Sequence, residues 1–154
     1  MFCVKSVSFS VFLNGSPTPS FKPHRGIRQG DPLSPYLFIL CSKILSRLIL
    51  RAEAKGDIHG IEIARGAPSV SHLMFVDDTF LFCRATGQEM EAIKQCLSPY
   101  ETWSGQKVSL EKSSLLFSPN SSQELKALIH NTSGMGPMKK DERYLGNPLF
   151  FFEK

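Results

Sequence analysis

The sequence contains no long hydrophobic run, and this absence argues against a membrane-spanning protein. Its longest uncharged apolar stretches, at residues 36–41 and 149–152, are far shorter than the ~18 residues that cross a bilayer. Residues 1–13 alternate between apolar and polar side chains, whereas a secretory signal has a basic start followed by a sustained apolar core. We therefore expect a soluble intracellular protein with no membrane partner.

Closely spaced cysteines and histidines are also missing. The cysteines are Cys3, Cys41, Cys83 and Cys96, and the histidines are His24, His59, His72 and His130. No Cys-x-x-Cys pair and no His-x-x-x-His pair occurs, so neither a disulfide framework nor a structural zinc site is expected. Free, buried thiols are the simpler interpretation.

The composition is that of an ordinary globular chain, with 42% apolar and 21% charged residues. Its 154 residues fit a single domain, 1–154. The net charge of +4 is unevenly distributed, because residues 1–60 hold eight Lys or Arg and three acidic residues. Lys22, Arg25 and Arg28 form a basic stretch with no acidic residue before Asp31. Such a stretch either contacts nucleic-acid phosphates or is simply a solvated loop.

The first half of the chain predicts a hairpin followed by a long helix. Residues 7–13 alternate like a half-buried strand, and Asn14-Gly15 is a strong hairpin turn signal. Apolar residues then recur every three or four positions over 33–55, which indicates an amphipathic helix. Either Asp31 before Pro32 or Ser34 before Pro35 caps this helix, and Gly56 ends it.

The second half mixes short strands with helices. We expect strands at 58–63, 72–76, 79–83, 108–110 and 115–117, and helices at 87–103 and 122–130. Thr86 is the expected cap of the helix at 87–103, Trp103 is expected on its inner face, and Pro99 is expected to kink or break it. The element order favours an α+β fold, in which an antiparallel sheet has helices packed on one face.

Asp77 and Asp78 are the sharpest chemical feature. Neighbouring side chains of a regular strand point to opposite faces, so the two carboxylates share a site only if the strand breaks at them. A tight hairpin between the two flanking apolar runs would provide that break. Paired carboxylates suit Mg²⁺, which takes oxygen ligands, although an exposed acidic turn without any ligand is the plainer alternative.

The passage Arg-Gly-Ile-Arg-Gln-Gly-Asp-Pro-Leu-Ser-Pro at 25–35 is a second candidate site. Its glycines allow a ligand to approach the backbone closely, and a helix N-terminus favours anions. Arg28 and Gln29 can donate hydrogen bonds to phosphates, sugars or base edges. The alternative is a flexible loop before a well-capped helix.

Together these segments resemble the reverse transcriptase domain of LINE-type (non-LTR) retrotransposons, especially plant elements. The block at 25–40 is similar to the motif that enters the central palm helix, and Phe75-Val-Asp-Asp78 is similar to the catalytic hairpin, where Val76 replaces the usual Ala. Ser104-Gly-Gln-Lys-Val108 and Tyr144-Leu-Gly-Asn-Pro148 resemble the segments that follow, although Asn147 departs from the usual Leu. The matches run in order over about 2–150.

The resemblance implies a polymerase palm that performs RNA-templated DNA synthesis with two Mg²⁺ ions. It implies that Asp77 and Asp78 are catalytic metal ligands and that Arg28, Gln29 and Gly30 contact the incoming nucleotide or the template. Lys22 and Arg25 would contact nucleic acid. The implied partners are an RNA template, a DNA primer, deoxynucleoside triphosphates and other parts of the element's polyprotein, in the nucleus or the cytoplasm.

The resemblance also implies that the chain is a fragment. A further catalytic aspartate of such enzymes lies on a palm strand upstream of the matching region, and neither fingers nor thumb is recognised here. We therefore expect a partial palm that does not polymerise alone. The alternatives are a non-catalytic nucleic-acid-binding remnant and an inert pseudogene product.

Overall fold

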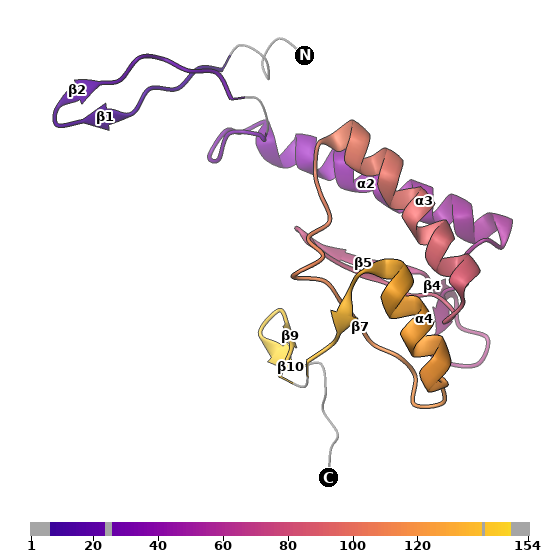
Figure 1. Ribbon diagram of the computed structural model, residues 1–154. Helices are drawn as coiled ribbons and strands as arrows, with labels where there is room; N and C mark the ends of the chain where they lie inside the picture. Colours follow the sequence, from indigo (N-terminus) through magenta and orange to yellow (C-terminus); the bar gives the residue numbers. More distant parts are fainter. Residues whose placement is uncertain (1–6, 24–25, 140, 149–154) are drawn as a thin grey trace. The chain divides into compact units, whose positions relative to one another are not determined.

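The computed structural model describes residues 7–23, 26–139 and 141–148 (Figure 1). The chain divides into two compact units, Met1–Ser42 and Lys43–Lys154, and each is described here by itself. No helix within the described ranges is long and apolar enough to span a membrane.

The first unit begins with the expected hairpin. Strands β1 (Phe12–Leu13) and β2 (Ser16–Pro17) pair antiparallel around Asn14 and Gly15, whose φ angles are 48° and 82°. A bridge between Phe9 and Phe21 extends the pairing. The expectation of a half-buried strand over 7–13 is wrong for β1, because Phe12 and Leu13 are 72% and 61% exposed. A hairpin with two-residue strands has too little apolar surface to bury its own side chains.

Helix α2 (Ser34–Lys55) has well-defined ends. The Asp31 carboxylate accepts a hydrogen bond from the Leu33 amide at 2.8 Å, so Asp31 is the capping residue. The Ser34 hydroxyl instead donates to the Arg28 carbonyl at 2.6 Å. At the other end the Gly56 and Asp57 amides donate to the Glu53 and Ala52 carbonyls, which is the Schellman pattern.

The strands of the second unit form separate two-stranded sheets. They are β3 (Ile61–Glu62), β4 (Ser69–Val70), β5 (His72–Phe75), β6 (Asp78–Leu81), β7 (Ser114–Leu115), β8 (Gly136–Pro137), β9 (Arg143–Tyr144) and β10 (Asn147–Pro148). β3–β4, β5–β6 and β9–β10 are antiparallel hairpins, and β7 pairs with β8 in parallel.

Two sheet predictions need correction. The described residues contain no single antiparallel sheet, because each of these pairs ends after two to four residues. No strand forms at 108–110, where the chain turns, and the strand expected at 115–117 lies at Ser114–Leu115. The mixed α+β class is confirmed.

Helices α3 (Gly87–Ser104) and α4 (Gln123–Ser133) are capped by Thr86 and Ser122 and end at Gly105 and Gly134. The predicted break at Pro99 is wrong, because α3 continues through it. Proline removes one backbone hydrogen bond, and the buried neighbours Cys96 and Tyr100 hold the helix on either side.

The core of the second unit lies where α3 packs on α4 and on the C-terminal half of α2 (Figure 1). The Cys96 thiol donates to the Leu48 carbonyl at 3.6 Å, and Lys94 donates to the Thr132 carbonyl. The buried apolar residues are Leu45, Ile49, Ala52, Ile58, Met90, Ile93, Cys96, Tyr100 and Ile129. Trp103 is 67% exposed, so the prediction that it faces inward is wrong. The described cysteines Cys41, Cys83 and Cys96 are free thiols, but of these only Cys96 is buried as expected, because Cys41 and Cys83 are partly exposed; Cys3 lies outside the described residues.

Candidate active site

The β5–β6 hairpin presents the acidic pair at its tip. Phe75 pairs with Asp78, so Val76 and Asp77 are the two central residues of the turn. Asp77 therefore lies in the turn itself and Asp78 is the first residue of β6. The strand alternation is interrupted between the two acids, as the sequence predicted, and the tip carries neighbouring carboxylates.

The backbone at this tip is strained. Val76 has a φ of 51°, a left-handed value that is unfavourable for a β-branched residue. Two-residue hairpins commonly place glycine where φ is positive. Val76 is 63% exposed, so burial of its side chain does not explain why a valine and not a glycine occupies this position. Strain of this kind often accompanies functional sites, because the surrounding structure must hold the turn in place.

Both carboxylates are exposed, and no hydrogen bond or ion pair in the described part of the chain engages them. Their oxygens are the donors that Mg²⁺ prefers, and it is commonly held by one or two carboxylates together with phosphates and water. Asp77 and Asp78 therefore fit a divalent cation chemically. No group of three or more potential ligand side chains (His, Cys, Asp or Glu) occurs among the described residues. A cation at the hairpin tip would meet two neighbouring carboxylates of the described residues.

His72, at the start of β5, ties the hairpin to α2. Its Nε2 is hydrogen-bonded to the Ser46 hydroxyl at 2.8 Å, and its Nδ1 to the Ser71 hydroxyl at 3.2 Å. Burial lowers the pKa of His72, although the Glu53 carboxylate opposes that shift. This role of His72 could not be predicted from the sequence, because Ser46 and His72 are 26 residues apart. The contact fixes the base of the hairpin whose tip carries the acids.

Glu53 of α2 supports the same region. Its carboxylate accepts hydrogen bonds from the Ser71 and Ser69 hydroxyls, which lower the pKa of Glu53 despite partial burial. The Ser69 hydroxyl lies 2.7 Å from a Glu53 oxygen. α2 thus holds both β4 and the residue that precedes β5.

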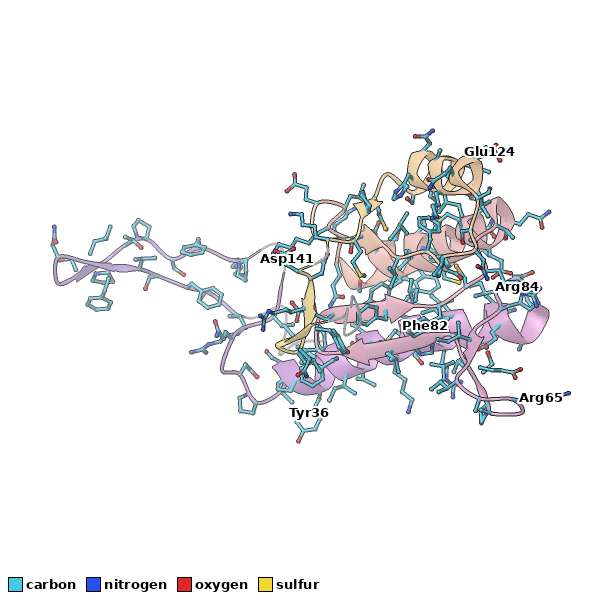
Figure 2. All side chains as sticks on the ribbon, turned by 90° about the horizontal axis from the view of Figure 1, so that it is seen from below. Tyr36, Arg65, Phe82, Arg84, Glu124 and Asp141 are labelled. Atoms are coloured by element: carbon cyan, nitrogen blue, oxygen red, sulfur yellow. The ribbon has the colours of Figure 1, made fainter. Side chains whose placement is uncertain are left out.

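An aromatic cluster joins β6 to the β9–β10 hairpin. The Phe80 ring packs edge-on against Tyr144, with centroids 4.6 Å apart, and stacks on Phe82 at 6.2 Å. Figure 2 labels Phe82 just beyond the end of β6. The Tyr144–Pro148 segment singled out from the sequence therefore lies against the acidic hairpin.

Glu89 is a buried acidic residue whose partners the sequence analysis did not predict. Its buried carboxylate accepts from the backbone amides of His59 and Arg84 at 3.0 and 2.9 Å and pairs with His59 Nδ1 at 2.8 Å. Burial raises the pKa of Glu89, but these hydrogen bonds outweigh it and the net shift is downward. Burial, aided by the Glu89 charge, raises the pKa of Cys83 to about 11.

The arrangement around Glu89 is structural. The Glu89 carboxylate, in the first turn of α3, connects this helix to His59 in the segment after α2 and to Arg84 in the segment after β6. A hollow of ≈ 470 Å³ lies beside it. Arg84, whose side chain is exposed at the surface (Figure 2), lines this hollow with His59. The sequence contains a partial signal, the Thr86-x-x-Glu89 capping pattern, but not the partners across the fold.

The second candidate, the loop before α2, belongs to the first unit. Arg28, Gln29 and Gly30 are exposed, and Gly30 has a φ of 80° that favours glycine. Arg28, Gln29 and Asp31 line a hollow of ≈ 390 Å³ together with Phe9 and other residues of the same unit. The structure thus brings Arg28, Gln29 and the capped start of α2 together. Lys22 is exposed, and Arg25 lies outside the described residues.

The sequence of the chain matches a family profile described as reverse transcriptase (RNA-dependent DNA polymerase) over residues 2–149. The chain therefore belongs to the reverse transcriptase family. The match covers nearly the whole sequence and confirms the reverse transcriptase family that the resemblance indicated.

A curated relative is an uncharacterised mitochondrial protein of Arabidopsis thaliana, with 52% identity over 67 residues. The match covers 44% of this chain and 55% of the relative, so the chain spans about half the length of that protein.

Proposed function

We propose that this chain is part of the palm of an RNA-directed DNA polymerase, and that Asp77 and Asp78 bind Mg²⁺ for nucleotidyl transfer. The observation that carries the proposal is the two-residue turn at the tip of β5–β6, which leaves two neighbouring carboxylates exposed and unengaged in the described structure. Membership of the family supplies the reaction class. The resemblance of residues 25–40 favours a LINE-type element as the source, and the relative from Arabidopsis thaliana agrees with a plant element.

In this proposal each part of the chain has a separate task. Asp77 and Asp78 supply oxygen ligands, and the His72–Ser46 contact keeps their hairpin on α2. Arg28 and Gln29 donate hydrogen bonds to the incoming deoxynucleoside triphosphate or to the template, while Gly30 lets the backbone come close. When bound, Mg²⁺ would neutralise charge on the phosphates and lower the pKa of the attacking 3′-hydroxyl.

We further propose that the chain alone does not polymerise. Nucleotidyl transfer with two metal ions requires several oxygen ligands, and the described residues cluster two carboxylates. The remaining ligands would come from another segment of the same enzyme. A complete palm would also pair the hairpin with a further strand.

Metal binding by the full chain tests the assignment. Mn²⁺, which electron paramagnetic resonance detects directly, replaces Mg²⁺ as the probe. We expect weak binding by the wild type and loss of that binding in Asp77→Asn. Asp141→Asn removes an equally exposed carboxylate elsewhere (Figure 2) and is expected to bind like the wild type. Equal binding by all three proteins would overturn the assignment.

Primer extension on an RNA template with Mg²⁺ tests the chemistry. The full chain is expected to incorporate no nucleotide by itself. Incorporation that disappears in Asp77→Ala would keep the catalytic role and overturn the proposed incompleteness. Incorporation that persists in Asp77→Ala would overturn the catalytic role.

A second candidate function is nucleic-acid binding without catalysis. The exposed Lys22 and Arg28 side chains favour it. Its signature is salt-dependent binding to an RNA–DNA hybrid that is lost in Arg25→Ala/Arg28→Ala and unaffected by Asp77→Asn. An inert chain would not bind the hybrid at all.

A further inference from the structure

The solvent face of α2 carries a row of cations within the second unit. Lys43, Arg47, Arg51 and Lys55 follow one another at every fourth position, and all four are exposed. Residues four apart lie one above the other on a helix and form a continuous ridge. We call these four residues the basic row.

The charge of the basic row is not neutralised within the described part of the chain. No ion pair there includes any of its members. The single acidic residue of α2 is Glu53, and its carboxylate is engaged by the Ser69 and Ser71 hydroxyls. The row therefore presents four positive charges to the solvent.

We propose that the basic row binds the phosphate backbone of a nucleic-acid strand, as a contact separate from the loop at 26–33. Each step of four residues advances about 6 Å along the helix, so the row is about 18 Å long. Phosphates of one strand of a duplex succeed one another every ~3.4 Å along the axis, so successive cations would meet roughly every second phosphate. The inference rests on one part of the proposed function, namely that this chain binds nucleic acid.

A nucleic acid fits the basic row better than an anionic membrane does. An amphipathic helix binds a membrane by inserting its apolar face. Here the apolar face of α2, with Leu45, Ile49 and Ala52, is buried in the protein core. Within the second unit, the large apolar residues that α2 exposes beside the row are Ile44 and Leu50, at 44% and 49% exposure. They are too few to anchor the helix in lipid.

The test compares two double variants of the full chain with equal loss of charge. Arg47→Gln/Arg51→Gln removes two cations of the row. Arg65→Gln/Lys139→Gln removes two exposed cations elsewhere, one of them on the β3–β4 loop where Arg65 extends outward (Figure 2). Glutamine has a helix propensity close to that of arginine, and circular dichroism verifies that α2 is retained. Binding of a fluorescent oligo(U) RNA is measured against salt concentration in EDTA.

Each phosphate contact of a single strand contributes about 0.7 to the slope of log K against log salt, so the row variant should lose about 1.4 from that slope. Between 50 and 200 mM salt the wild type would then lose about sevenfold more affinity than the row variant. The control variant is expected to keep the wild-type slope. Equal slopes for all three proteins, or an equal decrease in both variants, would overturn the proposal.

Two further outcomes separate this inference from its alternatives. Row-dependent binding to phosphatidylserine vesicles without binding to RNA would assign the row to a membrane and overturn the proposal. Because the assay contains EDTA, row-dependent RNA binding stands even if Asp77→Asn shows that the metal site is wrong. Conversely, RNA binding that is independent of the row overturns this inference alone, and absence of RNA binding overturns both proposals.

Discussion

Replacing Val76 at the tip of the acidic hairpin tests whether the turn is strained. A non-glycine residue in the left-handed region costs about 1–3 kcal/mol, and the φ of 51° places Val76 there. Val76→Gly and Val76→Ala lose the same two methyl groups, but only glycine relieves the strain. Since glycine in an ordinary backbone position costs about 0.5–1 kcal/mol relative to alanine, the net advantage of glycine at 76 is about 1 kcal/mol.

Thermal unfolding of the full-length variants measures this advantage. A free energy of about 1 kcal/mol corresponds to roughly 3 °C in Tm for a chain of this size, so Val76→Gly should melt about 3 °C above Val76→Ala. Val70 in β4 has no positive φ and is the matched control, where alanine should be the more stable replacement. If alanine were the more stable replacement at 76 as well, the turn would not be strained and the reasoning would be refuted.

Two further predictions concern buried polar groups. Glu89→Ala leaves the backbone amides of His59 and Arg84 without their acceptor, so the free energy of unfolding measured in urea is expected to fall by about 2–4 kcal/mol. Glu91→Ala, on the exposed face of α3, is the control and should change that free energy by less than about 0.5 kcal/mol. Similar losses in both variants would contradict the role of Glu89. Because burial lowers the pKa of His72 in the folded chain, the unfolded chain binds the proton more tightly. The free energy of unfolding should therefore fall as the pH decreases below about 6.5, the ordinary pKa of histidine, and become constant below the lowered pKa. His72→Gln should show a smaller fall over that range, and an unchanged pH profile would contradict the assignment.

Local sequence signals predicted the helices and the acidic hairpin well. Two apolar runs flank Asp77 and Asp78, which predicted a tight hairpin there, and the turn is centred on Val76 and Asp77, one residue before the expected pair. The ends of α2 were also predictable, because the hydrogen bonds that cap the helix at Asp31 and Gly56 join residues close together in the sequence.

Longer-range features were not predictable, because their causes lie in packing. The parallel pairing of β7 with β8 depends on α4 returning the chain past Ser114, and no sequence period encodes it. The helical pattern placed Trp103 inward, but α3 ends one residue later, beyond its contacts in the core. A propensity rule alone predicted a kink or break at Pro99, yet α3 continues through it in the folded chain.

The acidic site itself was predicted at the level of residues but not of its surroundings. The sequence shows that Asp77 and Asp78 are neighbours, but it does not show the Ser46–His72 contact that holds their hairpin. The contact of Arg28, Gln29 and Gly30 with the incoming nucleotide or the template, which the resemblance implies, stays a prediction, because the loop and the acidic hairpin belong to separate units.

Paramagnetic mapping by nuclear magnetic resonance shows whether Asp77 and Asp78 hold a divalent cation. Mn²⁺ added to the ¹⁵N-labelled full chain broadens the amide signals of residues close to the bound ion. The signals of Val76, Asp77 and Asp78 are expected to broaden first, and Asp77→Asn is expected to abolish the effect. Broadening that leaves the hairpin tip unaffected, or that persists in Asp77→Asn, would contradict the account.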